Sequence, residues 1–279
     1  MRSIRRLFLP ALLALAACTH APVEAPAAGA PRADPAISAA DAAAIAALAP
    51  GGVLRAGVYV GSPTSYIGGE GGAPPRGVSF DLAQRAAREA GVKFQPEVFP
   101  SNDKLLEAAR AGAVDLVFTN ATAVRAEFLD FTPTVLEIQK SYLVAGASPI
   151  HDAAALDKPG TRIGVSRGST TSTELAHVLH SVQFVPMESL TAGRAALAKG
   201  ELDAYASNNA ILSQMGDALP GSRLLPGSWG REAFAFGIPK GRQAAMPWLA
   251  AFVTRARADG AVQRAAERAG VRGLVGAAR

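Results

Sequence analysis

The sequence predicts an α/β protein built as two similar lobes. Short apolar runs typical of buried strands alternate with helical segments in the order β-α-β-α-β. This order occurs twice, before and after about residue 145, and no sequence repeat relates the two halves. The alternation favours parallel sheets with right-handed crossovers. Two separate runs favour two lobes over one continuous sheet.

In the first half, capping residues and glycines bound each predicted element. Pro50 and the two glycines after it separate a short alanine-rich helix, capped by Ser38, from the folded body. Ser79 is expected to cap the next helix, and Gly91 and Gly112 are expected to end helices. The predicted elements are helices over 38–48, 79–90 and 103–111, and strands over 53–60, 92–98 and 114–118.

The second half repeats the pattern after a strand over 141–145. Gly200 and Gly270 are expected to end helices, and Pro247 to begin one. The predicted elements are strands over 162–166, 183–185, 202–206 and 234–238, helices over 171–179 and 190–199, a helix from 247 and a short last helix ending at 270.

Residues 1–17 have the pattern of a secretory signal, with a basic start, an apolar run and then small residues. The run is too short to span a membrane as a stable helix. The stretch Leu15-Ala16-Ala17-Cys18 resembles a bacterial lipobox, which predicts that Cys18 is lipidated. The alternative is an ordinary cleavage site beside an incidental cysteine. Cys18 is the only cysteine, so no disulfide or nucleophilic thiol is expected, and the lipid would be the only anchor.

The charge balance argues against a nucleic-acid partner. The chain carries 28 Lys and Arg against 23 Asp and Glu, a formal charge of +5. Removing Arg2, Arg5 and Arg6 with the signal leaves 25 against 23, or +2. That balance is too even to indicate nucleic-acid binding. Alanine, proline and glycine dominate from 19 to about 36, which predicts a flexible tether, so that 18–52 would join the anchor to the folded body.

A polar stretch from Thr119 to Arg125 follows the apolar run 114–118. In open α/β sheets, ligands bind beyond the carboxyl ends of the strands. Hydroxyls, an amide and backbone N–H groups can meet there with a guanidinium, whose planar fork matches a carboxylate. The stretch therefore predicts the floor of a pocket for a small carboxylated solute. Thr122 equally fits a helix cap.

A second polar stretch, from Gly168 to Thr171, stands between a predicted strand and a predicted helix. Free N–H groups at a helix start favour an anion, and glycine lets the backbone approach it. The rival interpretation is a phosphate-binding loop. No lysine follows in the required frame, so a nucleotide site is not expected.

From 53 to about 272 the order of short motifs resembles family 3 extracellular solute-binding proteins, the polar amino-acid receptors of ABC importers. Each motif is weak alone, but their order and spacing together are specific. The matching stretches are LRAGV at 54–58, GVSFDLA at 77–83, 105–115 with its Gly112, TAVR at 122–125 running to DFT at 130–132, GVSRGSTT at 164–171, ALAKGELDA at 196–204 and FGIPKG at 236–241.

The resemblance implies a two-lobed, type II periplasmic-binding-protein-like fold. Each lobe would be a mixed, mostly parallel sheet flanked by helices, and the ligand would be held in the cleft between the lobes. The two crossing strands would be those at 142–145 and 233–238. Lobe 1 would then comprise 53–143 with 234–279, and lobe 2 would comprise 144–233.

The resemblance also implies residue roles. Arg125 matches the family arginine that binds the ligand's carboxylate. Thr119 and Asn120 match positions that complete this contact, although family members commonly carry Ser or Thr where this chain has Asn120. Ser169 and Thr170 match the lobe 2 loop that holds the same carboxylate. An arginine after a turn is by itself more often solvated, so its assigned role rests on the surrounding match.

Two positions depart from the family pattern. Amino-acid binders carry an aspartate for the ligand's ammonium where this chain has Asn208, and an aromatic residue that covers the ligand where it has Asn102. A buried ammonium without an acid lacks its counter-charge. Other residues are candidates to supply what is missing: Glu137 and Glu70 for the charge, Tyr66 and Trp229 for the aromatic face. We therefore expect a small organic anion or a modified amino acid, held through its carboxylate by Arg125.

The leading hypothesis is a lipid-tethered, monomeric periplasmic receptor that closes on a small carboxylated solute and presents it to an ABC permease in the inner membrane. The solute would be an amino acid, a derivative or an organic acid. No enzymatic activity or cofactor is expected, because no His/Glu pair stands at a suggestive spacing. No metal is expected either, since His177 and His180 lack a third ligand nearby. One alternative is a cyclohexadienyl or arogenate dehydratase-like enzyme, which would need a cleft carboxylic acid as proton donor. A ligand-sensing module is the other.

Overall fold

The computed structural model describes residues 38–69 and 71–276. The predicted signal, Cys18, the tether up to residue 37 and Glu70 lie outside the described residues. The described residues belong to one compact unit, Ile37–Arg279. Among their helices, none combines the length and the apolar character that a membrane crossing requires.

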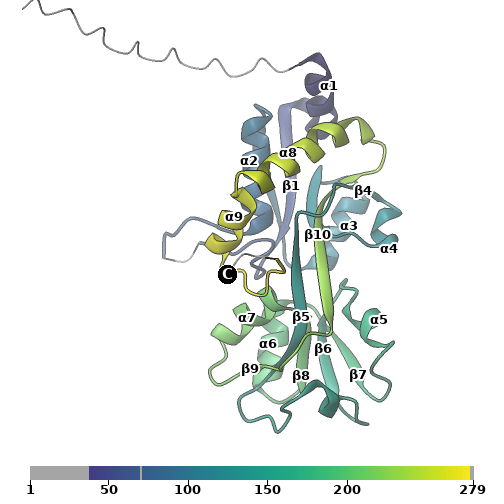
Figure 1. The fold of residues 1–279 in the computed structure, drawn as a ribbon, viewed down its shortest axis with the longest axis vertical. Coiled ribbons are helices and arrows are strands. Elements are labelled where there is room, and N and C mark those ends of the chain that lie inside the picture. Colours follow the sequence, from purple (N-terminus) through teal and green to yellow (C-terminus); the bar gives the residue numbers. More distant parts are fainter. Residues whose placement is uncertain (1–37, 70, 277–279) are drawn as a thin grey trace, which may run out of the picture. The chain divides into compact units, whose positions relative to one another are not determined.

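Lobe 1 is built on three parallel strands in the order β2-β1-β3. They are β1 (Val53–Tyr59), β2 (Lys93–Phe99) and β3 (Leu116–Asn120), connected by α2 (Val78–Glu89) and α3 (Asn102–Arg110) (Figure 1). These elements match the predicted alternation. As a result, the carboxyl ends of β1 and β3 meet at one edge of the sheet, followed by the short helix α4 (Ala123–Ala126).

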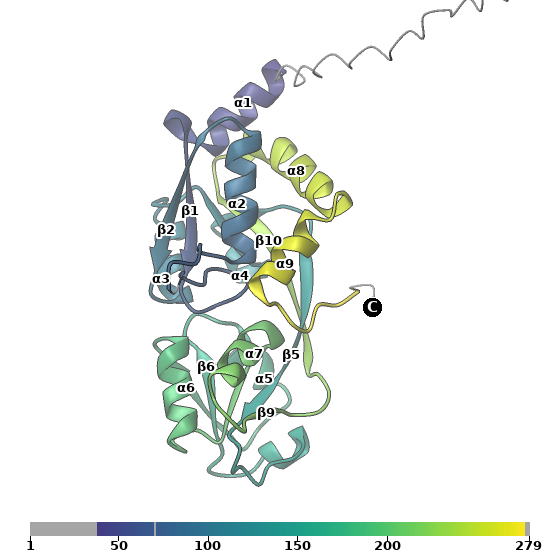
Figure 2. The same cartoon turned by 90° about the vertical axis from the view of Figure 1, so that its left-hand side faces the viewer.

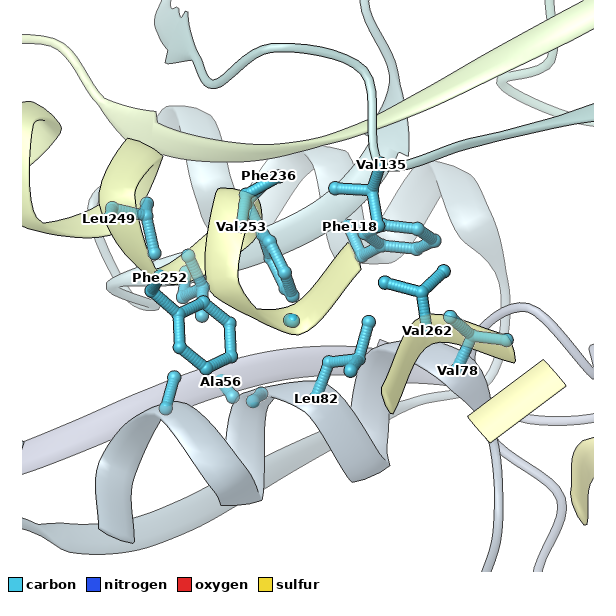
Figure 3. Close-up of a cluster of buried hydrophobic side chains, with 14 of the residues drawn as sticks. Ala56, Val78, Leu82, Phe118, Val135, Phe236, Leu249, Phe252, Val253 and Val262 are labelled. Carbon is cyan, nitrogen blue, oxygen red and sulfur yellow. The ribbon is translucent and has the colours of Figure 1, made fainter. Parts of the chain in front are cut away.

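The core of lobe 1 joins elements from both ends of the chain. Figure 3 shows Ala56 of β1, Leu82 of α2 and Phe118 of β3 gathered with Phe236 and Phe252. The rings of Phe118 and Phe236 lie 5.1 Å apart, between centroids. Phe252 belongs to α8 (Met246–Ala258), which is followed by α9 (Ala261–Ala269). The chain therefore returns to lobe 1 after building lobe 2.

The first described helix, α1 (Ala39–Leu48), belongs to the same core. The prediction of a helix capped by Ser38 is confirmed, because its hydroxyl accepts from the Asp41 N–H at 3.0 Å. Ile45 and Leu48 are buried against lobe 1, where α1 contacts α8 and the 3₁₀ turn η3 (Gln243–Ala245). A second 3₁₀ turn, η1 (Pro50–Gly52), leads into β1.

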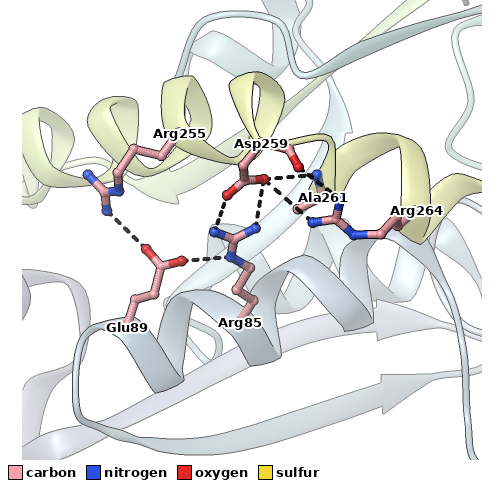
Figure 4. A network of polar contacts seen from close by, with 6 residues as sticks. All are labelled: Arg85, Glu89, Arg255, Asp259, Ala261 and Arg264. Atoms are coloured by element: carbon pink, nitrogen blue, oxygen red, sulfur yellow. Dashed lines mark hydrogen bonds and ion pairs between the residues drawn. The ribbon is translucent and has the colours of Figure 1, made fainter. Parts of the chain in front are cut away.

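Ion pairs also fasten the C-terminal helices to α2. The Arg85 guanidinium donates to both carboxylate oxygens of Asp259, at 3.0 and 2.6 Å, and to Glu89 at 2.6 Å (Figure 4). Arg255 of α8 donates to Glu89 at 3.1 Å. The hydrogen bond from Arg85 lowers the pKa of Asp259 to about 2. Exposed pairs of this kind add little stability singly, so the apolar core carries most of the attachment.

Lobe 2 has the same plan on a smaller scale. Its parallel strands, in the order β8-β6-β7, are β6 (Arg162–Ser166), β7 (Gln183–Met187) and β8 (Ala204–Asn208). Its other elements are η2 (Ala153–Leu156), α5 (Thr171–Leu175), α6 (Leu190–Ala198) and α7 (Asn209–Asp217). Two apolar clusters fill this lobe, one around Leu156 and Val165 and the other around Leu197 and Tyr205.

Two long antiparallel strands connect the lobes: β5 (Leu136–Val144) and β10 (Gly230–Pro239) (Figures 1 and 2). From Lys140 onward β5 pairs with β8, whereas β10 pairs with β3 from Phe234 onward. Short β4 (Leu129–Phe131) joins β10, and β9 (Arg223–Leu224) joins β5. The hydrogen-bonded ladder is therefore continuous through ten strands. The sequence pattern suggested two separate sheets because it does not show that two strands serve both lobes.

Several local predictions were wrong. Ser79 does not cap α2; Gly77 is the N-cap, and the N–H groups of Val78 and Ser79 donate to loop carbonyls at 3.0 Å. Helix α5 ends at Leu175 instead of 179, and α7, β4 and β9 were not predicted. Strand β3 extends to Asn120, because its last residues pair with β10, a partner distant in sequence.

Each lobe contains the same arginine–aspartate pair at the start of its first strand. In lobe 1 the backbone N–H and Nε of Arg55 donate to Asp115, both at 2.9 Å. In lobe 2 the same two groups of Arg162 donate to Asp203, at 2.7 and 3.2 Å. Asp115 has a second partner, Arg242, and its side chain is fully buried. These pairs tie the strand carrying the arginine to the segment that leads into the third strand of each lobe.

Candidate functional site

The candidate site is a cavity between the lobes, at the carboxyl ends of their parallel strands. Polar groups from both lobes and from β10 line it: Tyr59, Asn102, Thr119, Asn120 and Arg125 from lobe 1, Ser166, Ser169 and Asn208 from lobe 2, and Glu232 from β10. Its volume is about 30 Å³, enough for water only. A solute of amino-acid size would need the lobes to move apart, since ligand pockets commonly measure ~300 Å³ or more.

Arg125 lies at the centre of the lobe 1 wall. It is 5% exposed, and its Nη1 donates to Thr119 Oγ1 at 2.5 Å and to the Asn120 carbonyl at 3.2 Å. Its Nη2 donates across the cavity wall to the Gly168 carbonyl at 3.0 Å. All three acceptors are neutral. Burial lowers the pKa of Arg125, while the charge of Glu232 acts in the opposite direction, and an arginine side chain stays protonated in any case.

The helix α4 aims Arg125 into the cavity. Thr122 is its N-cap, and its hydroxyl accepts from the Arg125 N–H at 3.4 Å. That contact is the capping alternative for Thr122 raised by the sequence. The strand β3 supplies Thr119 and Asn120 from its last two positions, directly beside the guanidinium.

The Gly168 loop faces Arg125, but with its carbonyl group. Gly168 O accepts from Arg125 and also from Asn102 Nδ2, at 3.1 Å. Gly168 has φ 75°, and a Cβ there would lie 2.9 Å from Asp103, so glycine is required for this close approach. The Ser169 N–H, expected to be free for an anion, donates to Ser166 O at 3.0 Å.

The two hydroxyls of this loop differ in their surroundings. Ser169 Oγ is buried and has no hydrogen-bond partner among the described residues, and Ser169 lines the cavity. Thr170 lies outside the cavity lining, where its hydroxyl donates to Glu174 at 2.5 Å and accepts from Asn120 Nδ2 at 3.4 Å. Both Ser169 and Thr170 line an outer groove of about 370 Å³ that Arg125 also lines.

Asn208 is buried at the end of β8 and makes two hydrogen bonds, one as an acceptor and one as a donor. Its Oδ1 accepts from the Ile211 N–H at 3.1 Å, which caps α7. Its Nδ2 donates to Glu232 Oε2 at 2.7 Å. Burial raises the pKa of Glu232, and the hydrogen bond from Asn208 and the charges of Arg125 and Lys140 oppose that rise.

Sequence reasoning missed Glu232 and Tyr59. No motif marks Glu232; its place in the cavity follows from the register of β10 against β5, where it pairs with Ile138. Tyr59, the last residue of β1, is buried in the cavity wall, and burial raises its pKa. Its position after an apolar strand is the signal that could have indicated it.

The structure places the other sequence candidates away from the cavity. Tyr66 does not line it; its ring packs edge-on against Phe80, with 5.4 Å between centroids. Trp229 packs on Tyr142, and its Nε1 donates to Ser141 O at 3.0 Å. The side chain of Glu137 is 40% exposed and lies 3.9 Å from Arg231. None of the three supplies the charge or the aromatic face that the family pattern lacks here.

An ion pair from the middle of β5 lies next to the site. Lys140 is 6% exposed, pairs with Glu174 of α5 and lies 4.5 Å from the ring centroid of Trp229. Glu174 in turn accepts from Thr170. Lys140 is thus neutralised by its own partner. For a metal, the described residues contain no group of three or more His, Cys, Asp or Glu in suitable positions.

Comparisons with known proteins agree with this fold. The family model described as bacterial extracellular solute-binding proteins, family 3, matches residues 54–270. The ABC transporter glutamine-binding protein of Bacillus subtilis (strain 168) is 24% identical over 189 residues, which span 66% of this chain and 68% of that protein.

Solved structures of low identity share the fold. A mutant of the arginine-binding protein from T. maritima superposes with a TM-score of 0.72 at 18% identity, covering 81% of this chain and 98% of that one. An ancestral amino-acid-binding protein, described as a precursor of cyclohexadienyl dehydratase, superposes with a TM-score of 0.67 at 22% identity, covering 78% and 95%.

Proposed function

Because this chain belongs to the bacterial extracellular solute-binding proteins of family 3, we propose that it is the substrate-binding component of an ABC importer. Its ligand is a small carboxylated solute, and the binding site is the cavity between the lobes. Family membership implies an extracytoplasmic location. The proposal adds a monomer in the periplasm, an inner-membrane permease as partner and a lipid anchor at Cys18. It keeps lobe 2 as expected from the sequence, 144–233. Lobe 1 keeps 53–143 with 234–279 and gains α1, which the sequence had assigned to the tether over 18–52.

The observation that carries the proposal is the state of Arg125. A buried guanidinium normally has a carboxylate partner, because an unpaired buried charge is costly. Arg125 is 5% exposed and donates only to neutral oxygens. A carboxylate is the group that this fork would bind with two parallel hydrogen bonds. Thr119 and the unpartnered hydroxyl of Ser169 stand close enough to assist.

Hydrogen bonds between the two lobes hold them closed in this structure. Gly168 O receives hydrogen bonds from Asn102 and Arg125, and Thr170 Oγ1 receives one from Asn120, so the lobes touch directly. A solute must separate them to enter, and β5 and β10 are the connections that can bend. The solute favours the closed arrangement only if it contacts both lobes, because only a difference in affinity between two states shifts their balance. A carboxylate between Arg125 and Ser169 makes both contacts.

Calorimetry with the L-amino acids and a set of small organic acids tests this function. Replacing Arg125 by Ala should weaken the best ligand at least about 100-fold, which is about 3 kcal/mol. The matched control is Arg88→Ala, which removes an exposed arginine of the same lobe and should leave affinity unchanged. Binding that Arg125→Ala leaves intact would disprove the carboxylate site.

One observation favours a second function, a dehydratase-like enzyme. Glu232, which the sequence did not single out, is a carboxyl group in the cavity, and burial raises its pKa. Incubation with prephenate and arogenate, followed by detection of phenylpyruvate or phenylalanine, separates the two functions. Turnover that is lost in Glu232→Gln would establish the enzyme.

A further inference from the structure

Two opposite charges face the cleft cavity without pairing with each other. Arg125 donates only to neutral oxygens, and Glu232 accepts one hydrogen bond, from the Asn208 amide. Over residues 38–69 and 71–276, neither group lies within ion-pair distance of an opposite charge. The other cation whose charge acts on Glu232, Lys140, is paired with Glu174. The cavity wall therefore presents one unmatched cation and one unmatched anion.

The orientation of Asn208 determines how Glu232 is held. Asn208 Oδ1 accepts from the Ile211 N–H, so turning the amide over would bring its NH₂ group against that donor. The cap of α7 therefore fixes Nδ2 toward Glu232. A carboxylate at 208 would instead place an oxygen 2.7 Å from a second carboxylate, where like charges repel. Asn208 thus offers a ligand cation no negative charge, but it positions an acid that does.

We propose that Glu232 receives the cationic group of a zwitterionic solute whose carboxylate lies on Arg125. This inference rests on the proposed function and narrows its ligand class. A zwitterion neutralises both unmatched charges when it enters. An organic anion would neutralise Arg125 but would add a second negative charge to a cavity in which Glu232 is already unmatched. The expectation of an organic anion, drawn from the loss of the acid at position 208, is thereby replaced.

The surroundings of Glu232 support this role. Burial raises its pKa, which is the effect expected of a carboxylate that lacks a cation. Its neighbour Arg231 points outward, with a side chain 66% exposed. The acid candidate Glu137 is likewise turned away from the cavity, and Glu70 lies outside the described residues. Among the described acids, Glu232 alone lines the cavity.

The test compares amino acids with their deaminated analogues by calorimetry. The probes are the twenty L-amino acids and, for each, the acid without its amino group, such as L-glutamine with glutaramate and L-alanine with propanoate. The wild type should bind the best amino acid about 100-fold more tightly than its analogue. In Glu232→Gln, which keeps the size and the acceptor for Asn208, this preference should fall below about tenfold.

Two further experiments test the role of Glu232: a matched control variant, and a double variant that exchanges the acid and the amide between positions 208 and 232. Glu137→Gln makes the same chemical change on the neighbouring strand, outside the cavity, and should keep the full preference. Asn208→Asp alone should weaken zwitterion binding, because it sets two carboxylates together. The double variant Asn208→Asp with Glu232→Gln restores one acid and one amide, and aspartate caps a helix as well as asparagine does. It should recover most of the preference.

The outcomes separate this inference from the function on which it rests. Analogues that bind as tightly as their amino acids, or a preference that Glu232→Gln leaves unchanged, overturn the role of Glu232. Binding of only non-zwitterionic acids overturns it too, and in each case loss of affinity in Arg125→Ala preserves the carboxylate site. If no probe binds, or if binding ignores Arg125, both fail. Thermal unfolding of each variant confirms that it is folded.

Discussion

Two groups of charged side chains, one inside lobe 1 and one lining the cleft cavity, are arranged in opposite ways. Asp115 is fully buried and meets two arginines: Arg55, at 2.7 Å from Nη2, and Arg242. Arg125 and Glu232 line one cavity, yet neither has an ionic partner within the described part of the chain. The first group is complete within the protein, whereas the second has room for another molecule's charges.

The difference separates a structural role from a binding role. Burial alone would raise the pKa of Asp115, but the hydrogen bonds from Arg55 and Arg242 hold it below its ordinary 3.8. For Glu232 burial prevails, and its pKa lies above the ordinary 4.5. A charge that the fold has satisfied stabilises the fold. A charge left unsatisfied in a cavity costs stability, which a ligand can restore.

The largest effect on stability is expected from removing the carboxylate of the Asp115 group, which is paired within the protein. Asp115→Asn leaves two arginines without their carboxylate, so the free energy of unfolding should fall by about 3 kcal/mol. Urea unfolding measures this. Ligand affinity, measured on folded protein, should stay within about twofold of the wild type, because Asp115 does not line the cavity. A stable variant that has lost affinity would show that the two groups are not separate.

A smaller effect is expected from the corresponding pair of lobe 2. Asp203 has a single arginine partner, Arg162, and both side chains are about a third exposed (34% and 38%). Solvent screens such a pair, so Asp203→Asn should cost only about 1 kcal/mol in the same urea experiment. A loss as large as that of Asp115→Asn would mean that burial and the second arginine do not distinguish the two pairs.

The smallest expected effect concerns pH: ionisation of Asp115 stabilises the fold, whereas ionisation of Glu232 destabilises it. Because the folded pKa of Asp115 is lowered, its stabilisation is complete above 3.8 and is lost as pH falls further. Glu232, which faces Asn208, Arg125, Lys140 and Glu174, has a raised folded pKa. Its charge therefore costs stability increasingly as pH rises above 4.5.

Unfolding curves from about pH 2 to 7 check this comparison, because the range must extend below the lowered pKa of Asp115. The stability gap between wild type and Asp115→Asn should narrow toward low pH. The stability of Glu232→Gln relative to wild type should instead increase toward neutral pH. If the stability of both variants relative to wild type changed with pH in the same direction, the two groups of charges would not differ as described.

The candidate site could be predicted only in part from the sequence. Arg125, Thr119, Asn120 and Ser169 stand at strand ends within recognisable motifs, and the structure brings all four to one cavity. Tyr66 was expected there because an aromatic face was missing, but its loop turns the ring onto Phe80. The packing of a long glycine-rich loop depends on the elements around it, which no local pattern describes.

The sequence by itself determined the two α/β lobes, the succession of most of their strands and helices along the chain, and the arginine that lines the cavity. Those features arise from local periodicity, from caps and from short motifs. Only the tertiary structure decided that Glu232 shares a cavity with Arg125 and that Asn208 holds it there. The physical reason is strand register: which side of β10 meets the cavity depends on its pairing with β5 and β3, residues about 90 to 120 positions away in sequence.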